Sequence, residues 1–367
     1  TLFVRPPSDP GTVDFFQDYR HGELWVGRRP ALSELEASSG IHCRPLGELA
    51  AALDASARTR VRRGLDVEVD ALVEAGDPHP DGELRALLSE LRLVKDAWEV
   101  EQVEQAVAAT IRGFEDAVRA LPAAIESGGE RHVEGVFALW ARSEGNDAAF
   151  NPIVACGRHA TTLHWTRNDG PLLPGELLPV DAGVETHSLY AADLTRTLPV
   201  DGAFTPDQRR VLELVNSAHE AALEAVRPGA PFRAFRRAAA KVTAEGLAEW
   251  GLVPVTAAES LRDDSGLHRR YTLCAPGHML GLDVHDCADA RAETYLDGAL
   301  EPGNVLTVEP GLYFQSDDLT VPEALRGMGV RIEDDVVVTE TGCRVLSDRL
   351  PRRPDDVEAW MASLRTE

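Results

Sequence analysis

In the region from about residue 150 onward, four carboxylates and one imidazole each lie beside an apolar, strand-like or glycine-rich segment. Side chains at neighbouring strand ends can meet at one place, so this pattern constrains how the strands must be arranged. A fold that gathers these groups has to bring strands from distant parts of the sequence together. The candidate metal ligands are Asp181, Asp193, His278, Glu309 and Glu333.

The first two carboxylates sit at the ends of successive strand-like segments. Asp181 ends an apolar segment, and Asp193 begins the next one twelve residues later. Two strands joined by a hairpin bring both carboxylates to one place. In the later segment 329–339, alternation puts three charged side chains on one face, namely Arg331, Glu333 and Asp335.

Four carboxylates and one imidazole form an oxygen-rich ligand set. Such a set suits Mn²⁺, and also Zn²⁺ or Co²⁺, better than a thiolate-preferring metal. Because four negative ligands exceed what one divalent ion needs, we expect two ions with a bridging water that acts as hydroxide. Each residue also has an ordinary alternative, since an Asp near a strand end is usually a turn or cap residue. Spacing alone leaves both interpretations open.

The pattern of apolar residues predicts a mixed α/β (α+β) chain with two domains, 1–90 and 91–367. The turn-rich cluster 76–82 marks the boundary, and Pro122 with Gly128-Gly129 is expected to end a long helix. Predicted strands are 1–4, 24–26, 41–43, 177–182, 193–200, 305–308 and 329–339, and predicted helices are 83–120 (broken near 94–95), 132–143, 206–226 and 232–250.

Composition excludes several classes of function. With 61 acidic and 37 basic residues, the net charge of −24 repels nucleic acid. The five cysteines contain no C-x-x-C pair, which favours a reducing cytoplasm. No apolar run has the length of a membrane span, and no signal peptide is evident. The chain begins with Thr1, so we expect that the natural N-terminus is missing from this sequence.

The order of the ligand motifs resembles one family. Val-Asp-Ala-Gly, Ala-Asp-Leu-Thr-Arg-Thr, Gly-His-Met-Leu-Gly-Leu-Asp-Val-His-Asp, Val-Glu-Pro-Gly-Leu-Tyr and Gly-Val-Arg-Ile-Glu-Asp-Asp resemble the pita-bread (M24-type) metallopeptidases. The likeness is nearest to the aminopeptidase P and prolidase branch and runs from about 90 to 350. It implies a C-terminal pita-bread catalytic domain after a smaller, truncated α/β domain.

The resemblance also assigns roles to the five ligands. It implies that Asp181 binds one metal with both oxygens and that Asp193 and Glu333 bridge two ions. His278 and Glu309 would complete the coordination of the other ion. Glu309 would also pass a proton from the bridging water to the leaving nitrogen.

Four more positions match substrate contacts of the family. His164 would lie close to the substrate, and His285 would contact the scissile carbonyl and stabilise its oxyanion. Tyr313 and Arg331 look like markers of the proline branch. Arg331 would orient the carboxylates or hold a substrate carboxylate, and a structural ion pair with Glu333 or Asp335 is the alternative.

The sequence departs from the family at two places. The spacing of twelve between the two Asp ligands is one residue longer than is usual there. Cys274 stands where these enzymes usually have a histidine that lines the proline pocket, which leaves fine substrate preference open. His219-Glu220 opens like a zincin motif, but Leu223 replaces the second histidine, so we predict that this pair lies on the surface.

The resemblance implies an Xaa-Pro aminopeptidase, a metallo-exopeptidase that is a homodimer in the cytoplasm and acts on Xaa-Pro peptides. A prolidase restricted to dipeptides is the nearest alternative. A metal-free creatinase-like hydrolase and a non-catalytic binding protein on the same scaffold are further alternatives. The intact ligand set argues against both of these.

Overall fold

The computed structural model describes residues 1–54, 59–73, 78–272 and 276–365. The chain divides into two compact units, Thr1–Arg85 and Ala86–Glu367. The division falls inside helix α6 (Pro78–Glu90), near the boundary predicted at residue 90. That helix starts within the predicted turn cluster, because a proline at the first helical position already has the required backbone angle.

The first unit has a small apolar interior. Its strands β1 (Leu2–Val4) and β2 (Cys43–Pro45) pair in parallel. In its described part, the buried apolar side chains are Cys43 and Val61. Its other elements are α1 (Val13–Gln17), α2 (Glu23–Val26), α3 (Leu32–Ser39), a 3₁₀ turn (Leu46–Glu48), α4 (Leu49–Asp54) and α5 (Val67–Leu72).

The prediction of a strand at 24–26 is wrong, because the structure forms helix α2 there. Leu24 and Trp25 are exposed in this helix. A short apolar run carries too few residues to distinguish a strand from a helical turn. The predicted strand at 41–43 is shifted and becomes β2.

The second unit contains the helices and strands that position the site. Its helices are α7 (Ala97–Glu126), α8 (Gly129–Glu144), α9 (Pro206–Ala225), α10 (Arg233–Glu249), α11 (Ala257–Ser260) and α12 (Pro354–Leu364), with 3₁₀ turns at Gly157–Thr161, Leu267–Arg270 and Glu323–Leu325. Its strands are β3 (Asp147–Ala148), β4 (Ile153–Val154), β5 (Leu177–Ala182), β6 (Val184–Glu185), β7 (Leu194–Pro199), β8 (Val305–Val308), β9 (Gly311–Tyr313), β10 (Gly329–Arg331), β11 (Asp334–Val338) and β12 (Cys343–Val345).

The start and the end of the long helix α7 follow from local hydrogen bonds and packing. Asp96 caps it by accepting from the backbone of Glu99, and the Glu99 side chain accepts from the backbone of Asp96 in return. This helix ends at Glu126, just before Gly128-Gly129 as expected, but the prediction that Pro122 ends it is wrong. Leu121 and Ala124 are buried on either side of the proline, and their packing outweighs the lost backbone hydrogen bond.

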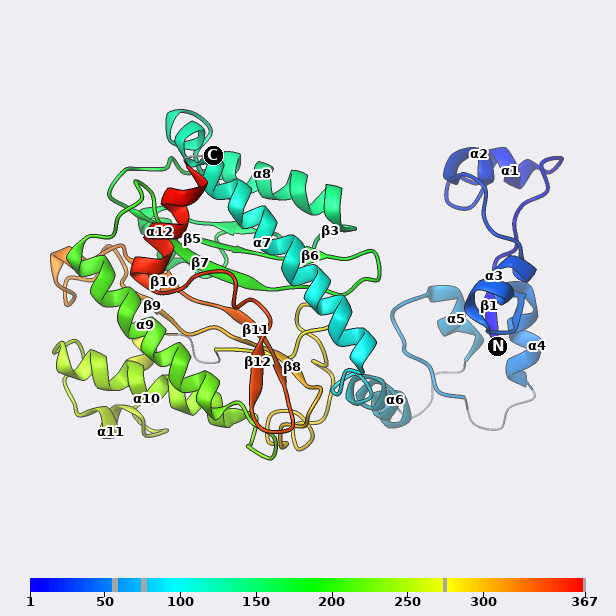
Figure 1. Cartoon of the computed structure of the whole chain (residues 1–367). Coiled ribbons are helices and arrows are strands. Elements are labelled where there is room, and N and C mark those ends of the chain that lie inside the picture. Colours follow the sequence, from blue (N-terminus) through cyan, green and yellow to red (C-terminus); the bar gives the residue numbers. More distant parts are fainter. Residues whose placement is uncertain (55–58, 74–77, 273–275, 366–367) are drawn as a thin grey trace. The chain divides into compact units, whose positions relative to one another are not determined.

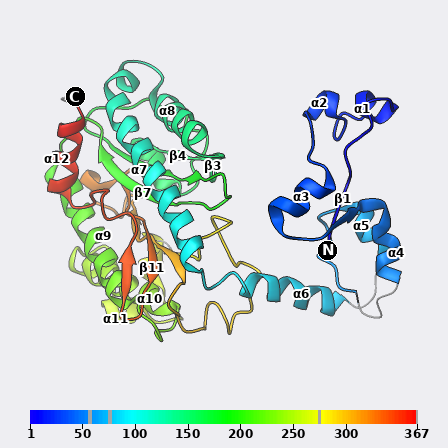
Figure 2. The same cartoon turned by 45° about the vertical axis from the view of Figure 1, so that its right-hand side comes forward.

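Two helix pairs enclose the strands. Figure 1 and Figure 2 show α7 beside α8 and α9 beside α10, with the site-bearing strands between the two pairs. Phe114 of α7 and Phe137 of α8 meet edge to face, with ring centroids 6.1 Å apart. The strands form the sheets β4-β5-β7, β12-β11-β8, β10-β9 and β3-β6.

The mixture of helices and strands agrees with the predicted mixed α/β (α+β) chain. No helix in the described ranges has both the length and the apolarity needed to cross a membrane.

Candidate metal centre and active site

Three strands place two of the candidate ligands in one row. Asp181 of β5 lies opposite Thr195 of β7 in an antiparallel ladder. Thr195 in turn forms an antiparallel bridge with Glu333, between β10 and β11. The Thr195 hydroxyl donates to Glu333 Oε2 at 2.7 Å. Because successive side chains of a strand alternate, this register turns both carboxylates toward the same side.

Asp193 directly precedes β7 and lies two residues before Thr195, so its side chain shares the face of Thr195. The backbone N–H of Asp193 donates to Asp335 Oδ2 at 3.1 Å. Asp335 therefore fixes the start of β7, and sequence analysis did not assign it this role. Its place on the same face as Glu333 was the available signal.

His278 arrives from a loop that packs on β8. Gly277 has a φ of +133°, and a Cβ there would lie 2.3 Å from the carbonyl oxygen of Thr307, so glycine is required. The Thr307 hydroxyl accepts from the His278 backbone at 3.1 Å, and His278 Nδ1 lies 3.1 Å from the Met279 carbonyl. The Nδ1 contact leaves Nε2 directed at the carboxylates.

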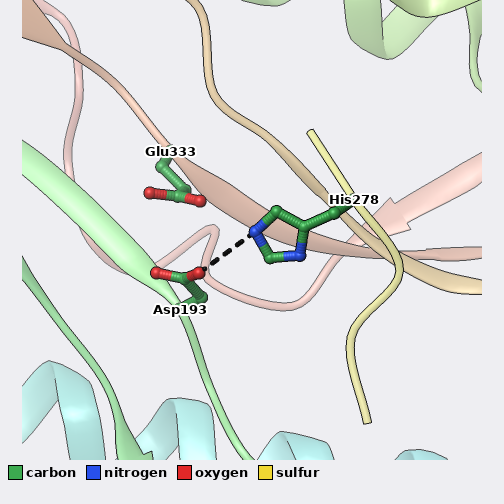
Figure 3. A group of neighbouring side chains, drawn as sticks. All are labelled: Asp193, His278 and Glu333. Carbon is green, nitrogen blue, oxygen red and sulfur yellow. Dashed lines mark ion pairs between the residues drawn. The ribbon is translucent and has the colours of Figure 1, made fainter. Parts of the chain in front are cut away.

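Figure 3 shows Asp193, His278 and Glu333 facing one another. Their candidate ligand atoms all lie within 4.8 Å of one another. His278 Nε2 is 3.3 Å from Asp193 Oδ2 and 3.6 Å from Glu309 Oε1. Glu309 follows β8, and Pro310 separates it from β9.

Arg331 lies on the opposite flank of the cluster, where it is buried. Its guanidinium donates to Asp181 Oδ2 from Nη2, to the Tyr313 hydroxyl from Nη1 at 3.1 Å, and to Thr195 Oγ1 from Nε at 3.0 Å. Its Nε is 3.9 Å from Glu333 Oε2. These contacts fit the orienting role expected for Arg331, and the approach to Glu333 also fits the structural ion pair that was its alternative.

Burial of Asp193, Glu309 and Glu333 in one cluster raises their pKa values, because several negative charges close together in the interior are unfavourable. Burial and the nearby charge of Asp181 raise the pKa of Asp193 to about 7, although His278 opposes this shift. Burial also raises the pKa of Glu309, and it raises the pKa of Glu333 well above its usual value. Burial acts against protonated His278, but contacts with Asp193 and Glu309 raise its pKa to about 9. Such clustered negative charge is what a cation relieves.

The residues fit divalent metal ions. Asp181 Oδ1 is buried and has no hydrogen-bond partner among the residues that the structure describes, and a buried carboxylate oxygen needs a proton donor or a cation. Carboxylate oxygens together with one imidazole nitrogen form a ligand set for Mn²⁺ or Zn²⁺. The five ligands proposed from the sequence therefore converge on one place.

A cavity of about 390 Å³ opens onto this cluster. The two histidines that the resemblance assigned to the substrate, His164 and His285, line it and are exposed. The His285 ring stands edge to face with the ring of His278, with centroids 4.4 Å apart. Burial, together with nearby His278 and His164, lowers the pKa of His285, so this imidazole is neutral near pH 7.

Sequence analysis missed several apolar residues that line the same cavity. Phe150, Ile153, Leu163 and Val284 form apolar walls beside the polar cluster. Leu163 and Val284 each precede one of the two cavity-lining histidines, and that adjacency was a usable signal. Cys274, which was expected near the proline pocket, lies outside the described residues.

The prediction that His219 lies on the surface is wrong. Its side chain is fully buried, and its Nε2 lies 3.2 Å from Asp334 Oδ2. Burial lowers the pKa of His219 to about 4. The residue lies four positions after Val215 on the apolar face of α9, and this periodicity indicated burial. It still takes no part in a zincin site.

Residues 101–340 match the profile of Metallopeptidase family M24. The chain belongs to this family. The match spans all five candidate ligands and His164 and His285, so the sequence-based identification of the family is confirmed.

Two similar M24 relatives come from Streptomyces coelicolor. The chain is 53% identical over 367 residues to its Xaa-Pro aminopeptidase 1, covering all of this chain and 74% of the relative. It is 54% identical over 358 residues to Xaa-Pro aminopeptidase 2, covering 97% of this chain and 75% of the relative. The likeness therefore extends through both units.

Solved structures of the family have the same fold. The structure of Pseudomonas aeruginosa aminopeptidase PepP matches with a TM-score of 0.84 and 31% identity, covering 100% of this chain and 83% of the other. A zinc-substituted Escherichia coli aminopeptidase P in complex with product matches with a TM-score of 0.82 and 29% identity, covering 94% and 81%.

Proposed function

We propose that the chain is an Xaa-Pro aminopeptidase, a metallo-exopeptidase that hydrolyses the bond between an N-terminal residue and a following proline. One observation carries the proposal. The five candidate ligands and two substrate-facing histidines line a single cavity in an M24 chain, and relatives more than half identical are named Xaa-Pro aminopeptidases.

Divalent cations, when bound, would supply a water of lowered pKa and polarise the substrate carbonyl. Asp181, Asp193, His278, Glu309 and Glu333 would hold them. We propose Mn²⁺, since the set is rich in carboxylate oxygen. Two ions match the four negative ligands, because each divalent ion balances two of them.

Glu309 is the residue that we assign to proton transfer. Burial raises the pKa of its carboxylate, which favours uptake of a proton, and Glu309 would return that proton to the leaving proline nitrogen. Its 3.4 Å contact with the Thr307 hydroxyl leaves its second oxygen available. His285, on the cavity wall, would donate to the carbonyl oxygen as negative charge develops there.

Proline suits a site of this kind for a physical reason. The bond before proline has no amide hydrogen, so an enzyme that grips that N–H loses a contact. The residues assigned here act instead on the carbonyl oxygen and on the leaving nitrogen. The carboxylate cluster also offers a place for the substrate's free amine, which would restrict cleavage to the N-terminus.

The test compares an Xaa-Pro-Xaa tripeptide with an Xaa-Pro dipeptide, each with Mn²⁺ and with a chelator. We expect metal-dependent cleavage of the tripeptide. Cleavage of the dipeptide alone would identify a prolidase, and cleavage of neither by metal-loaded protein would refute proline specificity. Activity that survives complete removal of metal would refute the metal-dependent mechanism. The homodimer and the cytoplasmic location remain predictions.

A further inference from the structure

We propose that Glu130 is a positioning residue of the active site, which holds the loop 155–170 and thereby fixes the place of His164 beside the substrate. The inference rests on the proposed function, since His164 matters only where substrate binds. It assigns a role to a carboxylate that is far from the metal ligands in the sequence and contributes nothing to their cluster.

Glu130 accepts four hydrogen bonds from this one loop. Its Oε1 accepts from the backbone N–H of Cys156 at 2.7 Å and lies 2.8 Å from His159 Nδ1. Its Oε2 accepts from Trp165 Nε1 at 2.9 Å and from the backbone N–H of Gly170 at 2.7 Å. A carboxylate only accepts, so His159 must carry its proton on Nδ1. The carboxylate thus grips the loop at both ends and in the middle.

The surroundings are shaped around this carboxylate. Glu130 is the second residue of α8 and is fully buried. A Cβ at Gly170 would lie 2.5 Å from the His159 ring and 3.0 Å from Glu130 Oε1, so only glycine fits there. The His159 ring stacks on Trp165, with centroids 3.9 Å apart. Both of these side chains are therefore held by packing as well as by Glu130.

His164 depends on this support. In the part of the chain that the structure describes, no hydrogen bond holds its ring, which is exposed on the cavity wall. The position of the ring is therefore set by the loop backbone, and the next residue is Trp165, whose indole Glu130 binds. A displacement of about 1 Å in a substrate-positioning group costs up to roughly 100-fold in rate.

Glu130→Gln tests the proposal with little change in volume. The amide nitrogen replaces one acceptor, so two of the four donors face another donor. We expect kcat/KM for the tripeptide to fall about tenfold to hundredfold, with metal content unchanged. Amide hydrogen exchange should become faster at Cys156 or at Gly170, whichever backbone amide faces the new NH2 group, and this readout needs no activity. Unchanged exchange at both amides would overturn the proposal.

A matched pair of tryptophan variants guards against general destabilisation. Trp165→Phe removes the indole bond to Glu130, while Trp140→Phe removes an indole bond of 2.9 Å from α8 to the Ala109 carbonyl. Both indoles are half-buried, and each lies under an arginine. We expect Trp165→Phe to lower kcat/KM and Trp140→Phe to leave it near wild type. Equal losses in the two variants would overturn the proposal.

The deciding experiment is a double-mutant cycle between Glu130→Gln and His164→Ala. If Glu130 acts through His164, the double variant should be no slower than His164→Ala alone. Fully additive losses, or a His164→Ala variant as active as wild type, would overturn the positioning role. Wild-type protein that does not cleave the peptide would instead refute the proposed function. The hydrogen-exchange measurement would still show whether Glu130 holds the loop 155–170.

Discussion

The active site has a strand side and a loop side, and the two are built differently. On the strand side, Asp181 and Glu333 are buried and lie in register across neighbouring strands through Thr195. On the loop side, His164 and His285 are exposed. Backbone ladders place the first set directly, whereas side chains from distant segments have to place the second. We infer that the strand side, together with His278 from the loop packed on β8, holds metal, and that His164 and His285 contact substrate.

The largest expected effect comes from breaking the strand side. Asp193→Ala or Glu333→Ala should abolish hydrolysis and lower bound metal, because each removes a group proposed to bridge two ions. Metal content and turnover should be measured on the same samples. Glu340→Ala, which removes an exposed carboxylate after β11, is the matched control and should behave as wild type. More than a tenth of wild-type activity in either ligand variant would contradict the bridging role.

The second effect breaks the loop side alone. His285→Ala should lower kcat by about 100-fold to 1000-fold, as is typical when a donor to an oxyanion is lost. Bound metal should not change, because the metal ligands remain. Steady-state kinetics with metal analysis of the same protein checks this. Loss of metal in the variant would mean that His285 supports the strand side instead.

A third prediction concerns the hydroxyl that links the strands. Thr195→Val removes the donor to Glu333 Oε2 and the acceptor for Arg331 Nε while it keeps the side-chain volume. Residues that orient ligands in this way typically change metal affinity by about 10-fold to 100-fold. Metal titration should show that loss, with kcat at saturating metal close to wild type. An unchanged metal affinity would show that the ladder alone orients Glu333.

The smallest expected change in activity comes from the anchor of the His285 loop. Lys95 and Asp286, the neighbour of His285, form a buried pair with Nζ 2.9 Å from Oδ2. Lys95→Met removes one of the two positive charges beside Asp286. The other remains, because Arg92 Nη2 still contacts Asp286 Oδ1 at 2.8 Å. Breaking such a pair costs about 3–5 kcal/mol in the free energy of unfolding.

We expect kcat/KM of the Lys95→Met variant to fall less than tenfold, because the remaining Arg92 contact still holds the loop. Chemical denaturation with Lys241→Met, an exposed lysine, as control measures the stability loss. An unfolding free energy equal to that of the control would contradict the structural role of the pair.

The strands that carry candidate ligands could be predicted from the sequence. Most of the side-chain contacts that hold the loops of His164 and His285 could not. β5 forms at 177–182 as expected, and four of the five candidate ligands lie at or beside strand ends, whereas His278 comes from a loop packed on β8. Apolar alternation and breakers such as Pro310 are local signals. These local signals locate the strands, and the pairing of the strands then fixes where the side chains at their ends lie.

Long-range side-chain contacts leave no such local signal. Glu130 looks like one more acidic residue at the start of a helix, and its four donors lie 26 to 40 positions away along the chain. The error at 24–26 has a different cause, since a three-residue apolar run has no periodicity to read. His219 is a third case. Its place on the apolar face of α9 indicates burial, whereas its partial likeness to a zincin motif says nothing about exposure.

The most direct test of this division measures metal content and kcat/KM side by side for Glu333→Ala and His164→Ala. We expect Glu333→Ala to lose both bound metal and activity. We expect His164→Ala to retain the metal content of wild type while its kcat/KM falls. Wild-type metal content in Glu333→Ala, or loss of metal in His164→Ala, would contradict the assignment of metal to the strands and substrate to the loops.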